Sequence, residues 1–448
     1  MKILTISIHF GPPFQQEMMR AAATAGHEVV FYSAGWTNVR RKIGLRWTER
    51  DGIPEAQLLN SGIVAGTSMD PSLQCGSSHV DAITEEVLDR VKPDVVHVHE
   101  LQAHGLSTLD VLRRRKVPYV VSVHNYWWVC PQLNLIAADG VACHDYNGGE
   151  KCTRCRLLPE ADSRAGVEFA KSIFTASPLF QPLRRLRQRT RRLLSKGKGS
   201  VAPNGWSEPR FAATDFARRR ALAVEGLNAA AAVHVMSTRT RMMLESYGVD
   251  AERIRVIPIT LKRVDALQRA KHVGGHPVTF GYRGLLSYAK GVHVLLAAFA
   301  TLDQTRARLV LHGAGEPEYE AGLRTMAKAL NVEFRGEYDA ARIQEIDSEI
   351  DVGVVSSLSE ETFCLTGLEF LRTGTPVIAS RLGGMVDYIR PDENGWLVPP
   401  GDVAALAARM QSIVDEPELA ASLDVSAPDL ASMPAVAGSI LNLYRNAN

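Results

Sequence analysis

Two glutamates, Glu361 and Glu369, stand eight residues apart within ETFCLTGLEFLRTGTPVIAS, residues 361–380. An apolar run at residues 351–357 precedes them and is typical of a buried strand. The Thr-Gly-Thr-Pro sequence inside the segment ends a helix, and residues 377–379 suit a second strand. The segment therefore predicts strand, loop, helix and strand, with Glu361 in the loop and Glu369 inside the helix.

The start of this predicted helix could bind a phosphate. Its first backbone N–H groups, at Cys364, Leu365 and Thr366, have no acceptor inside the helix, and the helix dipole attracts negative charge. Two glutamates would repel that phosphate unless Glu369 faces hydroxyl groups, as on a ribose, and Glu361 lies beside a sugar whose anomeric carbon becomes positive. A nucleotide-sugar meets both conditions. The alternative is a solvated Glu361 and a Glu369 on the helix surface.

Two further stretches could contact the same ligand. GYRGLLSYAKG, residues 281–291, follows a predicted strand and has three glycines, which let the backbone approach a phosphate while Lys290 supplies a charge. His124 ends a predicted strand, where parallel sheets collect ligands. The alternative for His124 is a hydrogen-bonded histidine with a structural role.

Residues 361–369 resemble the Glu-x7-Glu motif of the retaining GT-B glycosyltransferases, particularly family 4, the glycosyl transferases group 1. The usual pattern is E-x-F-G-L-x-x-L-E followed by A-x-G-x-P-V-I-A-S, and it is matched at Glu361, Phe363, Leu365, Leu368, Glu369, Gly374, Pro376, Val377, Ala379 and Ser380. Cys364 departs from it, since the family usually has Gly there. The signatures G-G-x-x-E-x-I and N-G-x-L-V-x-x-G-D follow at residues 383–389 and 394–402, with Asp387 in place of Glu.

The resemblance implies a role for each candidate residue. Glu361 would support the reacting sugar and Glu369 the ribose, while His124 in His-Asn-Tyr would approach the transferred sugar. The family's G-R-L-x-x-x-K-G loop supplies an Arg and a Lys to the diphosphate. Lys290 matches that Lys, whereas the position of the Arg is taken by Leu285. Arg283 stands two residues before that position and could substitute for the family's Arg by a different path, the alternative being an arginine in a surface salt bridge. The other residues expected to hold the donor are Gly313, Phe363, Cys364, Leu365 and Thr366.

The resemblance also implies an α/β protein of GT-B architecture, in which two Rossmann-like doubly wound domains face across a cleft. The expected activity is retaining transfer of a sugar from a UDP- or GDP-sugar to an acceptor, which could be a small molecule, a glycan or a lipid-linked molecule. No catalytic metal is required, since protein cations would neutralise the diphosphate. The alternatives are a nucleotide-sugar epimerase or phosphorylase of the same fold and an inactive nucleotide-sugar-binding protein.

Composition agrees with a large two-domain protein. The chain has 448 residues, 46% hydrophobic and 22% charged, which suits two domains of about 200 residues. A net charge of +2 gives no field that would select nucleic acid, and stacking aromatics on a basic face are not evident. The first residues have no signal-peptide pattern, and no apolar run is long enough to span a membrane. We therefore expect a cytoplasmic protein.

Strands and helices alternate in both halves of the chain. Residues 1–8, 15–25 and 27–33 read as strand, helix and strand, and the pattern continues through residues 80–124. It resumes at residue 278. We expect an acceptor domain at residues 1–265, a nucleotide-sugar domain at 266–430 and, by analogy with the family, a last helix at 431–448 that returns to the first domain. The linker is expected near residues 258–276.

Four of the six cysteines lie close together in the sequence, within an insertion at residues 127–158. These are Cys130, Cys143, Cys152 and Cys155, the last two in a Cys-x-x-Cys pair. In a chain expected to be cytoplasmic they predict a structural tetrahedral zinc site, with His144 as a spare ligand. Unmetallated or disulfide-linked thiols and an iron–sulfur centre are the alternatives.

Residues 184–198 hold eight basic residues, no acidic residue and three leucines. As a helix this run could contact an anionic membrane surface or attract a phosphorylated acceptor. A solvated surface is the favoured alternative. The expected partners of the protein are a nucleotide-sugar and an acceptor. A membrane surface, contacted through residues 184–198, and a second copy of the chain in a homodimer are further candidates.

Overall fold

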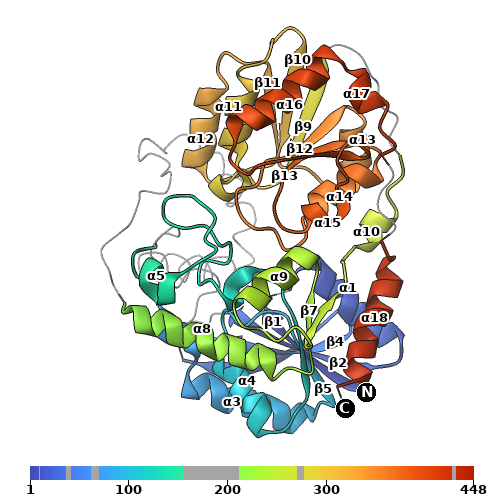
Figure 1. The fold of residues 1–448 in the computed structure, drawn as a ribbon. Helices are drawn as coiled ribbons and strands as arrows, with labels where there is room; N and C mark the ends of the chain where they lie inside the picture. Colours follow the sequence, from blue (N-terminus) through green and yellow to red (C-terminus); the bar gives the residue numbers. More distant parts are fainter. Residues whose placement is uncertain are drawn as a thin grey trace, which may run out of the picture.

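The computed structural model describes residues 1–9, 11–36, 42–61, 70–155, 211–269, 277–425 and 430–447. They form two lobes, each with one largely parallel sheet between layers of helices (Figure 1). This is the α/β class with two doubly wound domains that the sequence predicts. The basic run at residues 184–198 lies outside the described residues.

The first lobe contains an eight-stranded sheet in the order β3-β4-β2-β1-β5-β6-β7-β8. All neighbouring strands are parallel except β3 and β4, which form an antiparallel hairpin. The strands are β1 (Lys2–Ile8), β2 (Glu28–Trp36), β3 (Gly44–Arg50), β4 (Ile53–Leu59), β5 (Val95–Val98), β6 (Tyr119–Ser122), β7 (Ala232–Val235) and β8 (Ile254–Val256). Their apolar runs explain why the central strands are buried on both faces.

Helices cover both faces of this sheet. The helices α3, α4 and α8 pack on one face, and α1 packs on the other. The described helices of this lobe are α1 (Pro13–Thr24), α2 (Pro71–Cys75), α3 (Ser78–Val91), α4 (Ser107–Arg114), α5 (Glu150–Arg154), α8 (Ala213–Asn228), α9 (Thr238–Ser246) and α10 (Lys262–Asp265), with short 3-10 turns at Tyr126–Trp128 and Asn147–Gly149.

The second lobe contains a six-stranded parallel sheet in the order β11-β10-β9-β12-β13-β14. Its strands are β9 (Val278–Arg283), β10 (Ala307–His312), β11 (Val332–Gly336), β12 (Val352–Val355), β13 (Val377–Ser380) and β14 (Gly395–Val398). Its helices are α11 (Val292–Phe299), α12 (Pro317–Met326), α13 (Ile343–Asp347), α14 (Leu365–Arg372), α15 (Met385–Tyr388), α16 (Val403–Asp415) and α17 (Glu418–Ala421), with 3-10 turns at Tyr288–Lys290 and Ala340–Arg342. The order of elements places the amino end of α14 at the edge of the sheet that faces the first lobe (Figure 1).

The last helix, α18 (Met433–Arg445), follows the second lobe in sequence but packs on the first (Figure 1). Its buried face, with Val436, Ile440 and Tyr444, joins the same apolar cluster as Phe14 and Met18 of α1. Two stretches of chain therefore cross between the lobes, one before β9 and one before α18.

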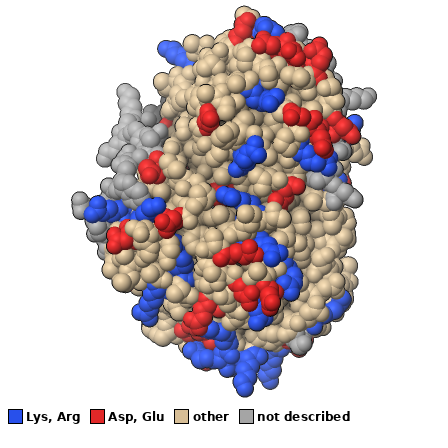
Figure 2. Space-filling model, in the orientation of Figure 1, with Lys and Arg blue, Asp and Glu red and all other residues tan. Residues whose placement is uncertain are grey.

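Acidic and basic side chains are interspersed over much of the face in Figure 2. Ion pairs between exposed side chains of the first lobe include Arg113 with Glu225 and Arg114 with Glu85. No helix within the described ranges has the length and apolar character needed to cross a bilayer.

Candidate active site

The loop before α14 brings the first predicted carboxylate to the amino end of that helix. Cys364 is the N-cap residue and adopts a left-handed backbone, φ 69°. A residue other than glycine is uncommon there, which accounts for the glycine usual at this position in the resembling family. The Tyr388 hydroxyl donates to the Cys364 carbonyl at 2.7 Å and helps to hold the turn. The first N–H groups of the helix, including those of Leu365 and Thr366, are left without acceptors inside it.

Lys290 and Glu361 form the charged pair of this site. The Lys290 ammonium lies 2.5 Å from Glu361 Oε1, and Ser357 Oγ donates to the same oxygen at 2.8 Å. Burial opposes the charge on Lys290, but the Glu361 carboxylate and the Cys364 thiol outweigh that effect and raise the pKa of Lys290. The second oxygen of Glu361, Oε2, accepts no hydrogen bond from any described residue. A cation, a carboxylate and a helix amino end thus meet at one place.

Glu369 lies deeper and is held by two arginines. Its Oε1 is 2.5 Å from Arg263 and its Oε2 is 2.9 Å from Arg283. Arg283 is fully buried and also pairs with Asp347 at 2.9 Å. Burial raises the pKa of Asp347 to about 6, and the Arg283 charge opposes that rise. Arg283, predicted to hold the diphosphate, therefore has its guanidinium engaged by two carboxylates below the site.

The glycine-rich loop owes its shape to close backbone packing. Gly313 has φ +147°, and a Cβ there would lie 1.8 Å from the Gly284 carbonyl oxygen. A Cβ on Gly291 would lie 2.0 Å from the Ser356 carbonyl oxygen. These glycines let the loop that carries Lys290 close against the end of β12. Leu285, where the resembling family has an arginine, is exposed.

His124 brings the first lobe to the same site. Thr362 Oγ1, next to Glu361, donates to the His124 carbonyl at 3.0 Å. The His124 ring lies against His99, with 2.7 Å between His124 Nε2 and His99 Nδ1. Burial, followed by the charge of His234, lowers the pKa of His124 to about 3, so the imidazole is neutral at physiological pH. It can exchange hydrogen bonds with a sugar hydroxyl but does not carry the second proton that would make it a cation.

Helix α9 joins the lobes beside this contact. Glu360 has a fully buried side chain and pairs with Arg239 of α9, while its Oε2 accepts a hydrogen bond from Gly383 N at 2.9 Å. Asp387 accepts from the backbone N–H of Thr238 at 2.6 Å, at the amino end of α9. The lobes therefore meet through specific polar contacts on both sides of Glu361.

The four predicted zinc ligands line one small cavity of about 20 Å³, beside Arg220. Cys130, Cys143, Cys152 and Cys155 are all free thiols. However, in the described part of the chain no three His, Cys, Asp or Glu side chains are arranged to hold a metal ion, so the zinc prediction is not supported. The segment instead reaches the other lobe, since a Cβ on Gly140 would lie 2.1 Å from Tyr288 Oη in the glycine-rich loop.

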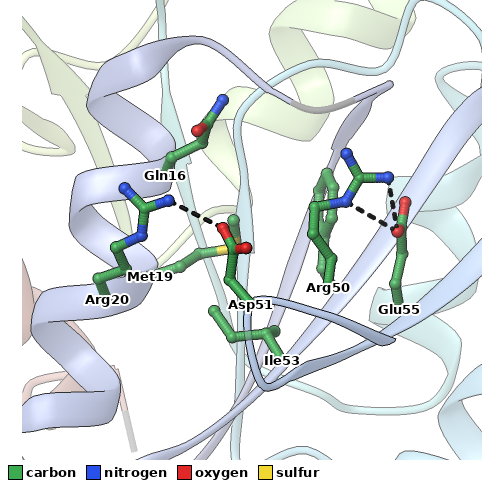
Figure 3. Close-up of a pocket in the computed structure, with 8 residues that line it drawn as sticks. Gln16, Met19, Arg20, Arg50, Asp51, Ile53 and Glu55 are labelled. Carbon is green, nitrogen blue, oxygen red and sulfur yellow. Dashed lines mark hydrogen bonds and ion pairs between the residues drawn. The ribbon is translucent and has the colours of Figure 1, made fainter. Parts of the chain in front are cut away.

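A larger cavity, about 310 Å³, lies in the first lobe between α1 and the β3–β4 hairpin (Figure 3). Arg20 pairs with Asp51 at 2.9 Å and Arg50 with the buried Glu55 at 3.0 Å, above the apolar Met19 and Ile53. None of the predicted site residues lines this cavity. It is separate from the site at Lys290.

Several residues of the site were not predicted. Arg263 lies in the linker, 106 residues before its partner Glu369, and no local pattern points to it. Ser357, Glu360 and Arg239 were also missed. His99 had a usable signal, because it ends the strand next to the one that leads to His124.

Two family models match the chain. The model described as "Glycosyl transferases group 1" matches residues 265–429, which include Lys290, Glu361 and Glu369. The model described as "Glycosyltransferase Family 4" matches residues 15–142, which include His124. A glycogen synthase from Mycobacterium tuberculosis is 33% identical over 148 residues, 32% of this chain and 36% of that protein. The chain thus spans well under two thirds of this curated relative.

Solved structures are similar over nearly the whole chain. Sucrose-phosphate synthase from Thermosynechococcus elongatus has a TM-score of 0.66 at 18% identity, covering 99% of this chain and 98% of that one. Anabaena Alr3699/HepE in complex with UDP-glucose has a TM-score of 0.57 at 14% identity, covering 100% and 98%. At these identities the likeness concerns the fold.

Proposed function

Because the chain belongs to glycosyltransferase family 4, the glycosyl transferases group 1, and has the GT-B fold, we propose that it moves a sugar from a nucleoside diphosphate sugar to an acceptor. The bond broken joins the anomeric carbon to the diphosphate, and the bond formed joins that carbon to an acceptor hydroxyl or amine. The observation that carries the proposal is the Lys290–Glu361 pair at the amino end of α14.

The diphosphate would lie against the start of α14. Negative charge gathers on it as it leaves, and the first N–H groups of the helix are already in place to stabilise that charge. The Lys290 ammonium lies beside them. Lys290 would turn from Glu361 to the phosphate, and Glu361 would then be left with the Ser357 hydrogen bond.

Glu361 would face the sugar from which the diphosphate departs. Its free Oε2 can stabilise the positive charge that develops on the anomeric carbon. We propose retention of anomeric configuration, as in the enzymes whose Glu-x7-Glu motif this chain resembles. The neutral His124 would exchange a hydrogen bond with a hydroxyl of the same sugar.

Glu369 would hold the ribose hydroxyls. Arg263 and Arg283 each engage one of its oxygens, and every carboxylate oxygen has a second lone pair for a hydroxyl donor. The two arginines also fix the carboxylate in orientation. We propose UDP or GDP as the leaving nucleotide, and similarly folded structures with bound UDP-glucose or ADP are consistent with a nucleotide-sugar donor.

The test is turnover of a panel of UDP-, GDP- and ADP-sugars by the purified protein, with and without small-sugar, glycan and lipid-linked acceptors. Release of nucleoside diphosphate that depends on an acceptor, with the donor's anomeric configuration kept in the product, supports the proposal. An epimerised donor would favour the epimerase alternative. Saturable donor binding without turnover in the whole panel would contradict transfer and favour a binding protein.

A further inference from the structure

A row of hydrogen-bonded polar side chains crosses the first lobe beneath the proposed site. Tyr444 Oη lies 2.5 Å from His97 Nδ1, and His97 Nε2 lies 2.8 Å from Ser122 Oγ. Ser122 Oγ then lies 2.7 Å from His234 Nδ1, and His234 Nε2 lies 2.8 Å from the Ile257 carbonyl oxygen. His97, Ser122 and His234 come from the neighbouring strands β5, β6 and β7.

The direction of every hydrogen bond in this row follows from its last member. A carbonyl oxygen only accepts, so His234 carries its proton on Nε2 and presents a bare Nδ1 when neutral. Ser122 must then donate to His234, His97 must donate from Nε2 to Ser122, and Tyr444 must donate to His97 Nδ1. Burial keeps both rings neutral, since it lowers the pKa of His234 to about 4 and that of His97 well below its usual value.

A second row lies directly above the first. His99 comes two residues after His97, and His124 comes two residues after Ser122. The side chains of His99 and His124 therefore lie on the same face of the sheet as the first row, about 6.6 Å nearer the strand ends. The rings of His97 and His99 have centroids 3.9 Å apart, whereas those of His99 and His124 lie edge to edge, with centroids 5.0 Å apart, 17° between their planes and the 2.7 Å hydrogen bond joining them. His99 is therefore held between the lower row and His124.

The lower row also binds both stretches of chain that cross between the lobes. Tyr444 belongs to α18, which follows the second crossing, and Ile257 comes just after β8, at the start of the first crossing. One continuous set of hydrogen bonds thus fixes the ends of both crossings to β5, β6 and β7.

Packing alone does not explain why histidine and serine occupy these positions. The neighbouring positions on the same face, Val95, Val120 and Ala232, are apolar and buried. Two imidazoles and a hydroxyl in such a layer cost free energy unless every polar atom is paired. Valine would fill the layer without that requirement. However, an imidazole at residue 97 that is fixed in orientation provides a flat surface on which the His99 ring can pack.

We propose that His99 is a positioning residue that sets the orientation and tautomer of His124, and that the row from Tyr444 to Ile257 holds His99 in place. The last helix of the chain thereby contributes to the geometry of the cleft without touching the substrate. The link to catalysis rests on the proposed function, in which His124 meets the transferred sugar.

The first test compares Tyr444→Phe with Tyr119→Phe. Both tyrosines are buried, 2% and 3% exposed, and Tyr119 donates to the Gly226 carbonyl at 2.7 Å, away from the histidines. The side-chain ¹⁵N shifts of the histidines are measured at pH 7, together with kcat and the donor KM. In the wild type His97 and His234 should be neutral with the proton on Nε2.

Tyr444→Phe should move the ring signals of His97, His99 and His124 and lower kcat about tenfold, with the donor KM within about twofold of wild type. Tyr119→Phe should do neither. The proposal is overturned if Tyr444→Phe leaves the His99 and His124 signals in place, or if His97 carries its proton on Nδ1.

A second pair of variants tests His99 directly. The amide of His99→Asn can replace Nδ1 as the partner of His124, whereas His99→Val removes it. Asn should therefore retain at least about tenfold more kcat than Val, and equal losses contradict the positioning role. If the wild type turns over no donor but Tyr444→Phe still moves the His124 signals, the proposed function fails and the positioning of His124 stands.

Discussion

The Lys290 ammonium lies 2.5 Å from Glu361 Oε1, so the glycine-rich loop and the loop before α14 share one ion pair. An anionic ligand that binds Lys290 must compete with Glu361 for it. Binding of a diphosphate would therefore release the carboxylate toward the sugar beside it. The proposed roles of the two residues, one for the leaving group and one for the anomeric carbon, follow from this exchange.

Glu369 should contribute to the stability of the fold as well as to donor binding. Glu369→Ala leaves the fully buried Arg283 with Asp347 alone, and removing one member of a buried ion pair costs about 3–5 kcal/mol. Urea unfolding of the variant measures this loss. Glu345→Ala is the control, because Glu345 forms an exposed pair with Arg342 and its loss should change the stability far less. Equal losses in the two variants would show that Arg283 does not depend on Glu369.

Arg239 should hold the lobes together. Arg239→Ala leaves the carboxylate of Glu360, whose side chain is 0% exposed, without a cation. This loss weakens the contact between the two lobes by about 2 kcal/mol. We expect Arg239→Ala to increase the radius of gyration in X-ray scattering and to raise the donor KM. Arg241→Ala on the same helix removes only an exposed pair with Glu245 and should change neither. A compact Arg239→Ala variant with unchanged KM would contradict this role.

Much of the fold could be predicted because parallel strands in this protein are continuous apolar runs. The strands predicted at residues 1–8 and 377–379 are β1 and β13, each within one residue of its observed bounds, and the predicted class and family are confirmed. The β3–β4 hairpin was missed although Asp51-Gly52 is a strong hairpin signal, and both residues have positive φ.

The site was less predictable, because its charge partners come from distant parts of the chain. Glu369 was predicted from the Glu-x7-Glu resemblance, but nothing near it in sequence points to its partner Arg263 in the linker. The zinc prediction was based on cysteine spacing and on the expected cytoplasmic location. Spacing brings the thiols to one cavity but does not fix the tetrahedral directions that a metal requires.

Acid should destabilise the protein through its buried histidines. Burial lowers the pKa of His104 to about 4, whereas the unfolded chain binds that proton near pH 6.5. The contribution of neutral His104 to the free energy of unfolding is therefore complete above pH 6.5, and it falls by about 1.4 kcal/mol per pH unit down to pH 4. Burial also raises the pKa of Glu100 to about 7, so this group changes the free energy of unfolding with pH in the opposite direction. The contribution of His104 must therefore be isolated by comparing variants with the wild type.

The comparison uses His104→Gln, whose amide can still donate to the Ser7 carbonyl, and His79→Gln at an exposed position. Between pH 6.5 and 5 the unfolding free energy of His104→Gln should depend less steeply on pH than that of wild type, by about one proton. His79→Gln should follow the wild type. Parallel curves for all three proteins would mean that His104 titrates normally in the folded state.

The thiols of the cysteine-rich segment should react slowly in the folded protein. Burial raises the pKa of Cys152 to about 11, which leaves about 100-fold less thiolate at pH 7.5 than in an unfolded chain. Alkylation by iodoacetamide, followed by peptide mass spectrometry, gives the rate for each cysteine. A Cys152 rate equal in native and urea-unfolded protein would contradict the buried state.

The most direct measurement of the central claim is calorimetric binding of UDP, GDP and ADP to three proteins: wild type, Lys290→Met and Lys328→Met. Lys328 is exposed on the same lobe and serves as the control. At least one nucleotide should bind the wild type and Lys328→Met equally, and Lys290→Met should bind it about 30-fold more weakly, as expected for a lost charge-assisted contact of about 2 kcal/mol. Failure of all three nucleotides to bind, or unchanged affinity in Lys290→Met, would contradict a diphosphate site at the start of α14.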